Sequence, residues 1–512
     1  MAARLRFSAL RPEIRDRVRA MTPSRLVSVL VFAAWPWASA CTPEPPPLPP
    51  PPPPQVVSSV PTTAPPSADA TFTTLTNDFL DGYLALEPVF ATTLGDHRHD
   101  DRWPDESAAG TARLRAFLVE QRARVAATPI ASMNLQNQVD ARILLDQIDG
   151  QLFSLDELKP EENNPVLYTT LVGDGLDPLL THTFAPIEER LHSVRARLVG
   201  IPALVTDAKA RLGHPPRVHT ETAIEQVKGL VALCDHGIFD AAAAAPALRA
   251  DVDAPAKAAA AALTDFQTFL EHDILPRSTG SFRAGPERFT KVLRYALHDD
   301  VSPDQLVLDA RAEMDRTLSE MVLVARELWP RLERGPVPAT HTKAEERSLV
   351  RTVLTRLADD ATDSNTILQD ATTTLTDATR FVADHDLVGV PSDPCRVIEM
   401  PEYRRGVTIA YCDSTGPLEK TPETVYAIAP APSSWPAKRA ASFYREYNHS
   451  MLVDLTVHEA MPGHYLQAMH RSSFRSPVRA IFEDGAFVEG WAVYGEWLMA
   501  KYGFGGAKTH MQ

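Results

Sequence analysis

The sequence predicts a mainly α-helical protein with a small antiparallel β-sheet in its last quarter. From Ala70 onward, apolar residues recur at three- and four-residue spacing, which is the period of an amphipathic helix. Between Val388 and Ala429 the pattern changes, and runs of valine, isoleucine and tyrosine are broken by proline, glycine and aspartate, as is typical of short strands. No repeat period recurs along the chain, so a solenoid is not expected.

The first residues predict an export signal that precedes the fold. Arginines come first, an apolar run extends from Leu26 to Trp37, and Ala38-Ser39-Ala40-Cys41 follows. The apolar run is too short to span a membrane as a helix. Small residues directly before a cysteine resemble a bacterial lipobox, so we expect a signal peptide over residues 1–40 and a lipid anchor on Cys41. Ordinary secretion, with Cys41 incidental, is the alternative.

A proline-rich segment follows the predicted anchor. Thr42 to Pro66 contains thirteen prolines, six of them in an unbroken run. Such a composition favours extended polyproline II and forms a stiff spacer, here over residues 41–69. A spacer of this kind lets a globular body, residues 70–512, stand away from a membrane. A low-complexity linker without a role predicts the same conformation.

Helices are expected through most of the body. The segment Pro186–Leu212 begins with proline and acidic residues, and another begins with Ser302-Pro303 and Asp304; both starts are typical of helix N-termini. The segment Ala241–His272 is so rich in alanine that intrinsic propensity alone favours a helix. The predicted helices are Phe72–Leu86, Pro104–Ala127, Leu135–Leu155, Pro186–Leu212, Thr220–Cys234, Ala241–His272, Ser302–Leu328, Thr342–Leu357, Ile367–His385, Lys438–Tyr447, His449–Ser472 and Pro477–Lys501.

Three strands are expected between these helices: Arg396–Met400, Val407–Cys412 and Thr424–Ile428. The edge strand of such a sheet can hold an extended peptide by backbone hydrogen bonds. A sheet that only packs against the following helix is the alternative. Cys395 and Cys412 flank a predicted hairpin, so they are the pair that could form a disulfide in an oxidising compartment.

The charge of the chain excludes one class of partner. The net charge is −15, and residues 1–40 hold seven arginines and two acidic residues, so the chain without them carries −20. A surface this acidic repels the phosphates of nucleic acid and anionic lipids. We therefore expect no nucleic-acid partner. The oligomeric state has no signature in the sequence.

The candidate functional site begins at Val457-His458-Glu459-Ala460-Met461-Pro462-Gly463-His464. In the common zinc-peptidase motif, H-E-x-x-H, two histidines four residues apart share one face of a helix. His458 and His464 are six apart, and at about 100° per residue their side chains would diverge by about 120° on a regular helix. Proline and glycine at 462 and 463 disturb helices. We therefore predict a break there that turns His464 toward His458.

A second cluster, Phe487-Val488-Glu489-Gly490-Trp491, contains the expected third ligand. Glu489 is assigned to the metal, and Gly490 is expected to let its helix approach the motif closely. Four carboxylates are candidates for orienting a ligand imidazole, by accepting a hydrogen bond from the ring nitrogen that does not bind the metal. They are Asp454, Glu483, Asp484 and Glu496.

These residues predict a zinc-dependent hydrolase. Two imidazoles and a carboxylate hold catalytic zinc, which lowers the pKa of a bound water to about 7. Glu459 adjoins a ligand, so it is expected to act as the general base that deprotonates that zinc-bound water and passes the proton to the leaving group. Other hydrolase and nucleotide-binding classes lack support, because the sequence has no G-x-S-x-G elbow and no G-x-x-x-x-G-K-[ST] loop.

The pattern HEAMPGHYLQ followed by FVEGWAVYGE resembles the bacterial family called "domain of unknown function 885", and GYLALEPVFATTLGDHRHDD resembles its N-terminal stretch. The resemblance covers roughly residues 70–506. It implies a large helical body of the gluzincin type, with zinc held by His458, His464 and Glu489 and with Glu459 catalytic. It also implies that the protein is an exported lipoprotein. Tyr447-Asn448, just before the motif helix, lies in a further stretch that is similar to the family's.

Members of that family usually continue well beyond the Glu-Gly-Trp helix. The resemblance therefore implies that this chain, which stops at Gln512, is truncated or is a shortened relative. Tyr444, Tyr447 and His449 are candidates for stabilising an oxyanion, although each is also explained by packing or surface exposure.

The functional expectation is a zinc metallopeptidase of the cell envelope that acts on peptides. It would be anchored through Cys41 to the outer membrane and face the periplasm. The alternative is a non-catalytic envelope lipoprotein that keeps the zinc fold as a binding scaffold. Hydrolysis of another amide or ester uses the same residues and differs only in substrate.

Overall fold

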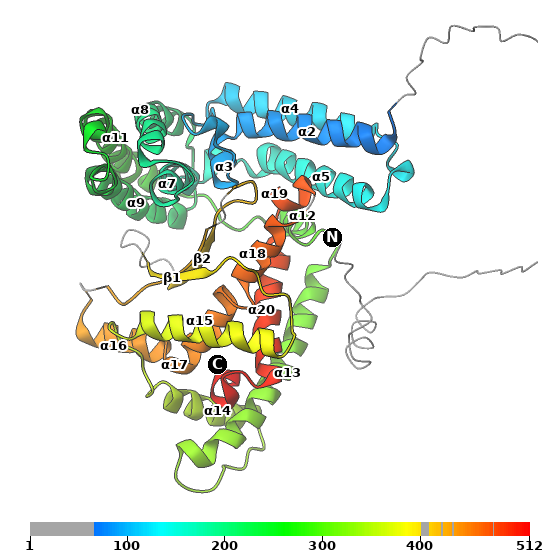
Figure 1. Ribbon diagram of the computed structural model, residues 1–512, viewed down its shortest axis with the longest axis vertical. Helices are drawn as coiled ribbons and strands as arrows, with labels where there is room; N and C mark the ends of the chain where they lie inside the picture. Colours follow the sequence, from blue (N-terminus) through cyan, green and yellow to red (C-terminus); the bar gives the residue numbers. More distant parts are fainter. Residues whose placement is uncertain (1–65, 401–408, 421–422, 433–434, 475) are drawn as a thin grey trace, which may run out of the picture. The chain divides into compact units, whose positions relative to one another are not determined.

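The computed structural model describes residues 66–400, 409–420, 423–432, 435–474 and 476–512. The predicted signal peptide, Cys41 and all but the last residues of the proline-rich segment lie outside these ranges. In the described part of the chain, the prediction of a mainly helical fold with a small sheet is confirmed (Figure 1). None of its helices combines the length and the apolar character that crossing a bilayer requires.

The first helices form an antiparallel layer around an aromatic core. Phe79, Leu118 and Leu144 are buried at its centre, where α2, α4 and α5 contact one another. The sequence produces this layer through polar N-caps: Ser67 and Ser107 each accept a hydrogen bond from a backbone amide of the first turn. The elements are α2 (Ala68–Leu86), α3 (Pro88–Thr93), η2 (His97–His99), α4 (Ala108–Ala126), η3 (Ile130–Ser132), α5 (Leu135–Phe153), η4 (Ser154–Leu158) and α6 (Pro160–Asn163).

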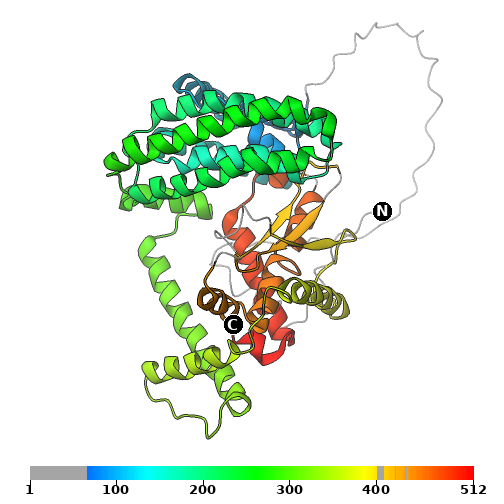
Figure 2. The same cartoon turned by 90° about the vertical axis from the view of Figure 1, so that its left-hand side faces the viewer.

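A second group of helices has its own core, built from leucine, valine and alanine side chains. Its central pair is α8 and α11, and Figure 2 shows these helices running alongside one another. The alanines of α11 that face α8 and α9 are buried, so the helices approach closely. The elements are α7 (Val166–Thr181), α8 (Ile187–Arg211), α9 (Arg217–Ala232), η5 (Leu233–Gly237), α10 (Ile238–Ala242), η6 (Pro246–Leu248), α11 (Arg249–Phe269), η7 (Leu270–Ile274) and η8 (Leu275–Arg277).

Two helices of more than ten residues in the described part of the chain have no counterpart among the predictions. Helix α7 contains Gly173, Gly175 and Pro178, which intrinsic propensity places outside helices. Tertiary packing overrides that preference, because Gly175 and Pro178 are buried in the second core. The other unpredicted helix is α12 (Pro286–Leu297), which follows the left-handed residue Gly285.

The sheet lies beside a helical layer of the C-terminal half. It consists of β1 (Cys395–Glu399), β2 (Ala410–Ser414) and β3 (Thr424–Ile428) in the order β1-β3-β2. Strand β2 pairs with β3 antiparallel, as predicted, whereas β1 pairs with β3 in parallel. The sheet is therefore mixed, because β3 occupies the centre, parallel to β1 and antiparallel to β2.

This strand order also corrects the predicted cysteine pair. Cys395 and Cys412 are free thiols on the two strands that flank β3, and Cys234 is a buried free thiol. Two strand spacings amount to about 9.5 Å. That separation exceeds the roughly 4.4–6.8 Å between Cα atoms that a disulfide requires. The thiols do not flank a hairpin, since β1 and β2 are not neighbours.

The remaining helices surround the sheet and carry the histidine motif. Helices α15, α17, α18 and α20 share one core with β2 and β3, in which Tyr426 and Leu466 are fully buried. Helices α13 and α14 pair with each other over a separate apolar cluster. The elements are α13 (Pro303–Leu332), α14 (Lys343–Leu357), α15 (Ile367–Asp384), α16 (Ala437–Glu446), α17 (His449–Glu459), α18 (His464–Ser472), α19 (Pro477–Ile481), α20 (Gly485–Tyr502) and α21 (Gly506–His510).

Candidate metal centre

Helix α17 supplies the first histidine at its C-terminal end. Asn448 caps its start, where the side-chain oxygen accepts hydrogen bonds from the amides of Ser450 and Met451. The last turn holds His458 and Glu459, and the helix ends because Ala460 leaves helical geometry, with φ −122° and ψ −87°. Asn448, which sits in the stretch similar to the family's, therefore has a structural role as a helix cap.

The predicted break between the histidines is confirmed. Residues 460–463 form a turn that contains a cis Met461–Pro462 peptide bond, and the amide of Gly463 donates to the carbonyl of Val457 at 3.0 Å. Only glycine fits at position 463, because a Cβ atom there would lie 1.7 Å from the carbonyl oxygen of His458. The turn starts α18 at His464, so the second histidine comes from a new helix.

Helix α20 closes over this turn and brings the carboxylates. Asp484 caps its start by accepting from the amide of Phe487, and the indole Nε1–H of Trp491 donates to the carbonyl of Pro462 at 2.8 Å. The expectation for Gly490 is wrong, since a Cβ atom there would meet nothing within 4 Å. Gly495 is the glycine that faces the turn, since a Cβ atom there would lie 3.5 Å from Cγ of Pro462.

The three predicted ligands come together at this junction. Nε2 of His458 lies 3.6 Å from Oε2 of Glu489, and Nε2 of His464 lies 3.9 Å from the same oxygen. The two imidazole rings are nearly perpendicular, with centroids 4.7 Å apart. One ligand atom from each residue falls within 4.8 Å of the others, and this is the one such cluster of three among the described residues.

Glu496 is the carboxylate that orients a ligand. Its Oε1 lies 2.5 Å from Nδ1 of His458, so Nδ1–H donates and Nε2 is left for the cluster. The alternatives have other partners: Glu483 pairs with Arg471, and Asp484 caps α20. Glu489 and Glu496 are seven residues apart and therefore lie on nearly the same face of α20. Glu489 faces Nε2 of His458, and Glu496 faces Nδ1 of the same ring.

The electrostatic environment distinguishes the two histidines. The hydrogen bond to Glu496 raises the pKa of His458 against the effect of burial. Burial and the neighbouring His458 lower the pKa of His464, which keeps its imidazole neutral. Burial, with Glu496 nearby, raises the pKa of Asp454 to about 7. The two imidazoles thus share a site in which positive charge is favoured on one ring only.

Glu459 is half-buried at the end of α17, which packs against β2. Burial raises the pKa of its carboxyl group, while the charge of His458 and the backbone of Cys412 act in the opposite direction. The predicted base therefore lies at the end of a helix that contacts the sheet, and no residue type in the sequence signals this contact.

The residues present fit a zinc ion. The donor set of two imidazole nitrogens and one carboxylate oxygen matches catalytic zinc sites, which keep a further position open. Glu489 is 66% exposed at its side chain, so the cluster opens to solvent on that side. Nδ1 of His464, unlike that of His458, is buried without a hydrogen-bond partner in the described part of the chain. The second imidazole is thus positioned by packing alone.

The oxyanion candidates are not brought to this cluster. His449 begins α17 and is held by Asp360 and Asp370, roughly 14 Å along the helix from His458. The hydroxyl of Tyr444 accepts from the amide of Ala431 at 3.0 Å, and the ring of Tyr447 packs on Phe443. Their contacts are those of packing and helix anchoring.

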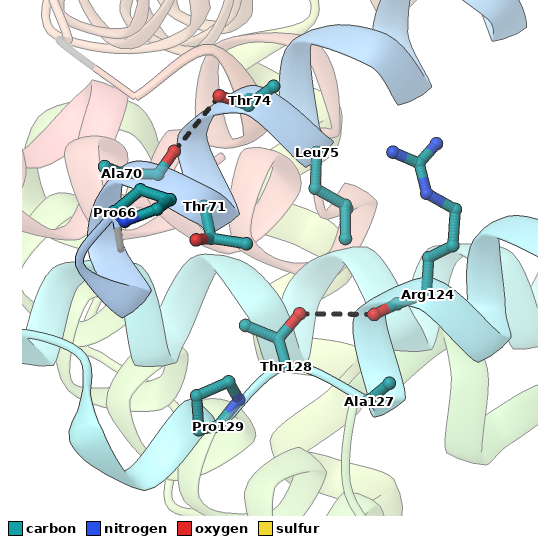
Figure 3. Close-up of a pocket in the computed structure, with 9 residues that line it drawn as sticks. All are labelled: Pro66, Ala70, Thr71, Thr74, Leu75, Arg124, Ala127, Thr128 and Pro129. Atoms are coloured by element: carbon teal, nitrogen blue, oxygen red, sulfur yellow. Dashed lines mark hydrogen bonds between the residues drawn. The ribbon is translucent and has the colours of Figure 1, made fainter. Parts of the chain in front are cut away.

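A separate pocket lies between the start of α2 and the end of α4. Figure 3 shows its nine lining residues, and its volume is about 550 Å³. Figure 3 shows the hydroxyl of Thr74 donating to the carbonyl of Ala70 and that of Thr128 donating to the carbonyl of Arg124. The guanidinium of Arg124 pairs with Asp78. These lining residues include no nucleophile, acid or metal ligand with a free function, so the pocket does not compete with the histidine cluster as a reactive site.

Comparison with known proteins agrees with this architecture. The fold and the cluster define a helical protein with a candidate two-histidine, one-glutamate centre. Residues 88–512 match the family described as "Bacterial protein of unknown function (DUF885)", and the chain belongs to this family. The family resemblance of the motifs is thereby confirmed. No match is found among curated proteins.

Two solved structures share the fold. One is described as a "putative lipoprotein of unknown function" from Shewanella oneidensis; it is 26% identical, with a TM-score of 0.68 over 86% of this chain and 80% of that one. The other is described as the "putative lipoprotein" from Colwellia psychrerythraea, at 17% identity and a TM-score of 0.68 over 87% of this chain and 80% of that one. The second likeness concerns the fold alone.

Proposed function

We propose that this protein is a zinc-dependent hydrolase, and specifically a peptidase of the cell envelope. The observation that carries the proposal is the convergence of His458, His464 and Glu489, one from each of three helices, within 4.8 Å. Glu496 supports it, because it leaves Nε2 of His458 directed at the cluster. The turn at 460–463 supports it as well, because it starts a new helix at His464 and so brings the second imidazole ring beside the first.

The protein residues have separate roles in this proposal. His458, His464 and Glu489 would hold the ion, and zinc when bound supplies Lewis-acid polarisation and water of lowered pKa. Glu459 takes the proton of the attacking water and delivers it to the leaving amine. Its raised pKa brings the carboxyl group closer to neutral pH, where both halves of such a transfer are efficient.

The sheet supports a peptide substrate over a small ester. Strand β2 is an edge strand of the sheet, and it packs against α17, the helix that carries Glu459. An extended chain laid along a terminal strand is held by backbone hydrogen bonds and brings its amide bonds past the base in succession. Peptide hydrolysis therefore uses the sheet as well as the cluster.

We also propose that the protein is an exported lipoprotein anchored through Cys41 in the outer membrane. The leader residues, the cysteine after small side chains and the proline-rich spacer support this location. The two structural neighbours described as lipoproteins point the same way. Cells are grown with radiolabelled palmitate, and its incorporation into the exported protein is measured. We expect the wild type to be labelled and Cys41→Ser not to be labelled.

One experiment tests the function. The purified wild-type protein, Glu459→Gln and the control Glu446→Gln, an exposed carboxylate at the end of α16, are assayed for zinc content and for digestion of a peptide library. We expect one zinc per chain in all three, and hydrolysis reduced at least about 100-fold in Glu459→Gln alone. Absence of stoichiometric zinc, or unchanged hydrolysis in Glu459→Gln, contradicts the proposal. Bound zinc without turnover by the wild type points instead to a binding scaffold.

A further inference from the structure

The N-terminal motif Gly95-Asp96-His97-Arg98-His99-Asp100 lies far in the sequence from the candidate metal centre and contributes no residue to it. Within this motif, His97 lies between two carboxylates. Nδ1 lies 2.8 Å from Oδ2 of Asp100, and Nε2 lies 2.8 Å from Oε2 of Glu419. The two carboxylates are almost fully buried, at 6% and 7% side-chain exposure. Phe184 stacks on the imidazole with ring centroids 3.5 Å apart.

The other contacts of the two carboxylates show a built network. Thr92 donates to Asp100 at 2.6 Å, and the fully buried Arg197 donates to Thr92 at 2.6 Å and to the carbonyl of Gly175. Burial alone would lower the pKa of His97, but the hydrogen bonds to Asp100 and Glu419 outweigh it and raise the pKa. Two cations, His97 and Arg197, thus balance two buried carboxylates, as buried charge requires.

The backbones at this contact touch directly. The amide of Leu418 donates to the carbonyl of Leu94 at 2.9 Å. A Cβ atom on Gly416 would lie 2.0 Å from the carbonyl carbon of Leu94, and one on Gly95, where φ is +84°, would lie 2.6 Å from the amide nitrogen of Glu419. Glycines on both sides therefore permit an approach that any side chain would prevent.

Glu419 belongs to the connection that leaves β2, five residues beyond the strand. The strand itself packs against α17, the helix that ends at Glu459. His182, at the end of α7, lies 3.5 Å from Asp413, and Thr183 donates to Glu423 at 2.9 Å. Strand β2 is thus fastened to the N-terminal helices at its far end, and Glu419, at 7% side-chain exposure, is the most buried carboxylate of these attachments.

We propose that the cluster of His97, Asp100 and Glu419 is a positioning site for the general base: it fixes β2, and β2 packs against α17, the helix that carries Glu459 at its end. This inference rests on the proposed hydrolase function for its catalytic consequence, but its structural part does not. None of the three residues would touch substrate or metal. Their effect reaches the reaction through the strand.

The test compares Glu419→Ala with a matched control. Glu161→Ala also removes an almost fully buried carboxylate, here one paired with Arg211 at 2.9 Å within the N-terminal helices, with no contact to the sheet. Glu419→Gln is the conservative variant, because its amide oxygen can still accept from Nε2 of His97. Hydrogen exchange of the β2 amides (residues 410–414), zinc content, kcat and KM are measured on the full chain.

We expect β2 amides to exchange about 10-fold faster in Glu419→Ala than in the wild type, since one charge-assisted attachment of the strand is lost. In Glu161→Ala they should exchange at the wild-type rate. Displacement of the base should lower kcat by about 10- to 100-fold, with KM and zinc content unchanged. Glu419→Gln should recover most of both effects.

Unchanged β2 exchange in Glu419→Ala, or equal acceleration in Glu161→Ala, overturns the proposal, because the cluster would then contribute only global stability. If Glu419→Ala does not fold, His97→Asn, which can reach Asp100 but not Glu419, decides the matter through the same exchange measurement. If no protein hydrolyses any peptide, the proposed function fails, while hydrogen exchange still shows whether the cluster holds β2.

Discussion

Nδ1 of His458 lies 2.5 Å from Oε1 of Glu496, on the side of the ring opposite the one that faces Glu489. Two carboxylates of one helix therefore contact the two nitrogens of one imidazole. The outer contact fixes the tautomer, and the inner one belongs to the candidate metal cluster. Both follow from a spacing of seven residues on α20, which returns a side chain to nearly the same face.

Removing the outer carboxylate should weaken zinc binding. In Glu496→Ala the His458 ring loses its hydrogen-bond acceptor and can rotate or change tautomer, so we expect the zinc dissociation constant to rise about 10- to 100-fold. Competition with a chromophoric chelator measures it. The control is Glu483→Ala, a carboxylate at the start of the same region that pairs with Arg471 instead. Equal weakening in both variants would show that Glu496 has no specific role.

The turn between the histidines should not tolerate a side chain. A Cβ atom in Gly463→Ala would overlap the carbonyl of His458, so the turn must shift and we expect a loss of about 1–3 kcal/mol in the free energy of unfolding. Zinc affinity should fall with it, because His464 follows directly. Gly490→Ala, which meets nothing, should instead gain about 0.5–1 kcal/mol, as alanine does inside a helix. Urea denaturation of the two variants checks both signs.

Glu87 should make stability depend on pH. Burial, with Glu106 nearby, raises its pKa from 4.5 to about 8 in the folded protein. The unfolded chain loses this proton near pH 4.5 and the folded chain only near pH 8, so between these values the folded state binds more protons. The free energy of unfolding therefore decreases as pH rises through this window.

Glu87→Gln replaces the carboxyl group by a neutral amide and should remove this decrease. At pH 7 the variant should be more stable than the wild type by up to about 3 kcal/mol, and at pH 4 the two should be alike. Denaturant titrations at several pH values measure the difference. The same titrations on Glu120→Gln, an exposed residue of α4, should follow the wild type. A wild-type curve that is flat between pH 5 and 8 would contradict the raised pKa.

The cysteines of the sheet should remain thiols. Because Cys395 and Cys412 flank β3 and cannot approach each other without unpairing it, oxidising conditions that leave the fold intact should not join them. Alkylation after denaturation, without a reducing agent, should label the peptides that contain each residue. Detection of a cross-linked peptide by mass spectrometry would show that the sheet opens.

The break at Pro462-Gly463 could be predicted from the sequence because it follows from helix geometry alone: two side chains six residues apart cannot meet on a regular helix. The same reasoning placed Glu489 and Glu496 on one face. What could not be predicted depends on packing between distant segments. Helix α7 forms although its glycines disfavour it, since Gly175 and Pro178 are buried against other helices.

The errors at the site have the same origin. Gly490 has the sequence context of a close contact, yet the rotation of α20 turns Gly495 to the turn instead. The parallel pairing of β1 depends on a crossover that strand patterns do not encode. The part of Cys412 that acts on the pKa of Glu459 is its backbone, which every residue possesses, so no residue type could have identified it.

The ligands of the candidate centre come from three helices that are separated by the turn at 460–463 and by the α18–α20 connection. An ion bound to all three would act as a cross-link that only the folded chain can form. At a concentration one hundred times its dissociation constant, such an ion adds about 2.7 kcal/mol to folding stability. Zinc scarcity would then reduce the amount of intact protein through proteolysis, and the abundance of the protein would report the metal supply of its compartment.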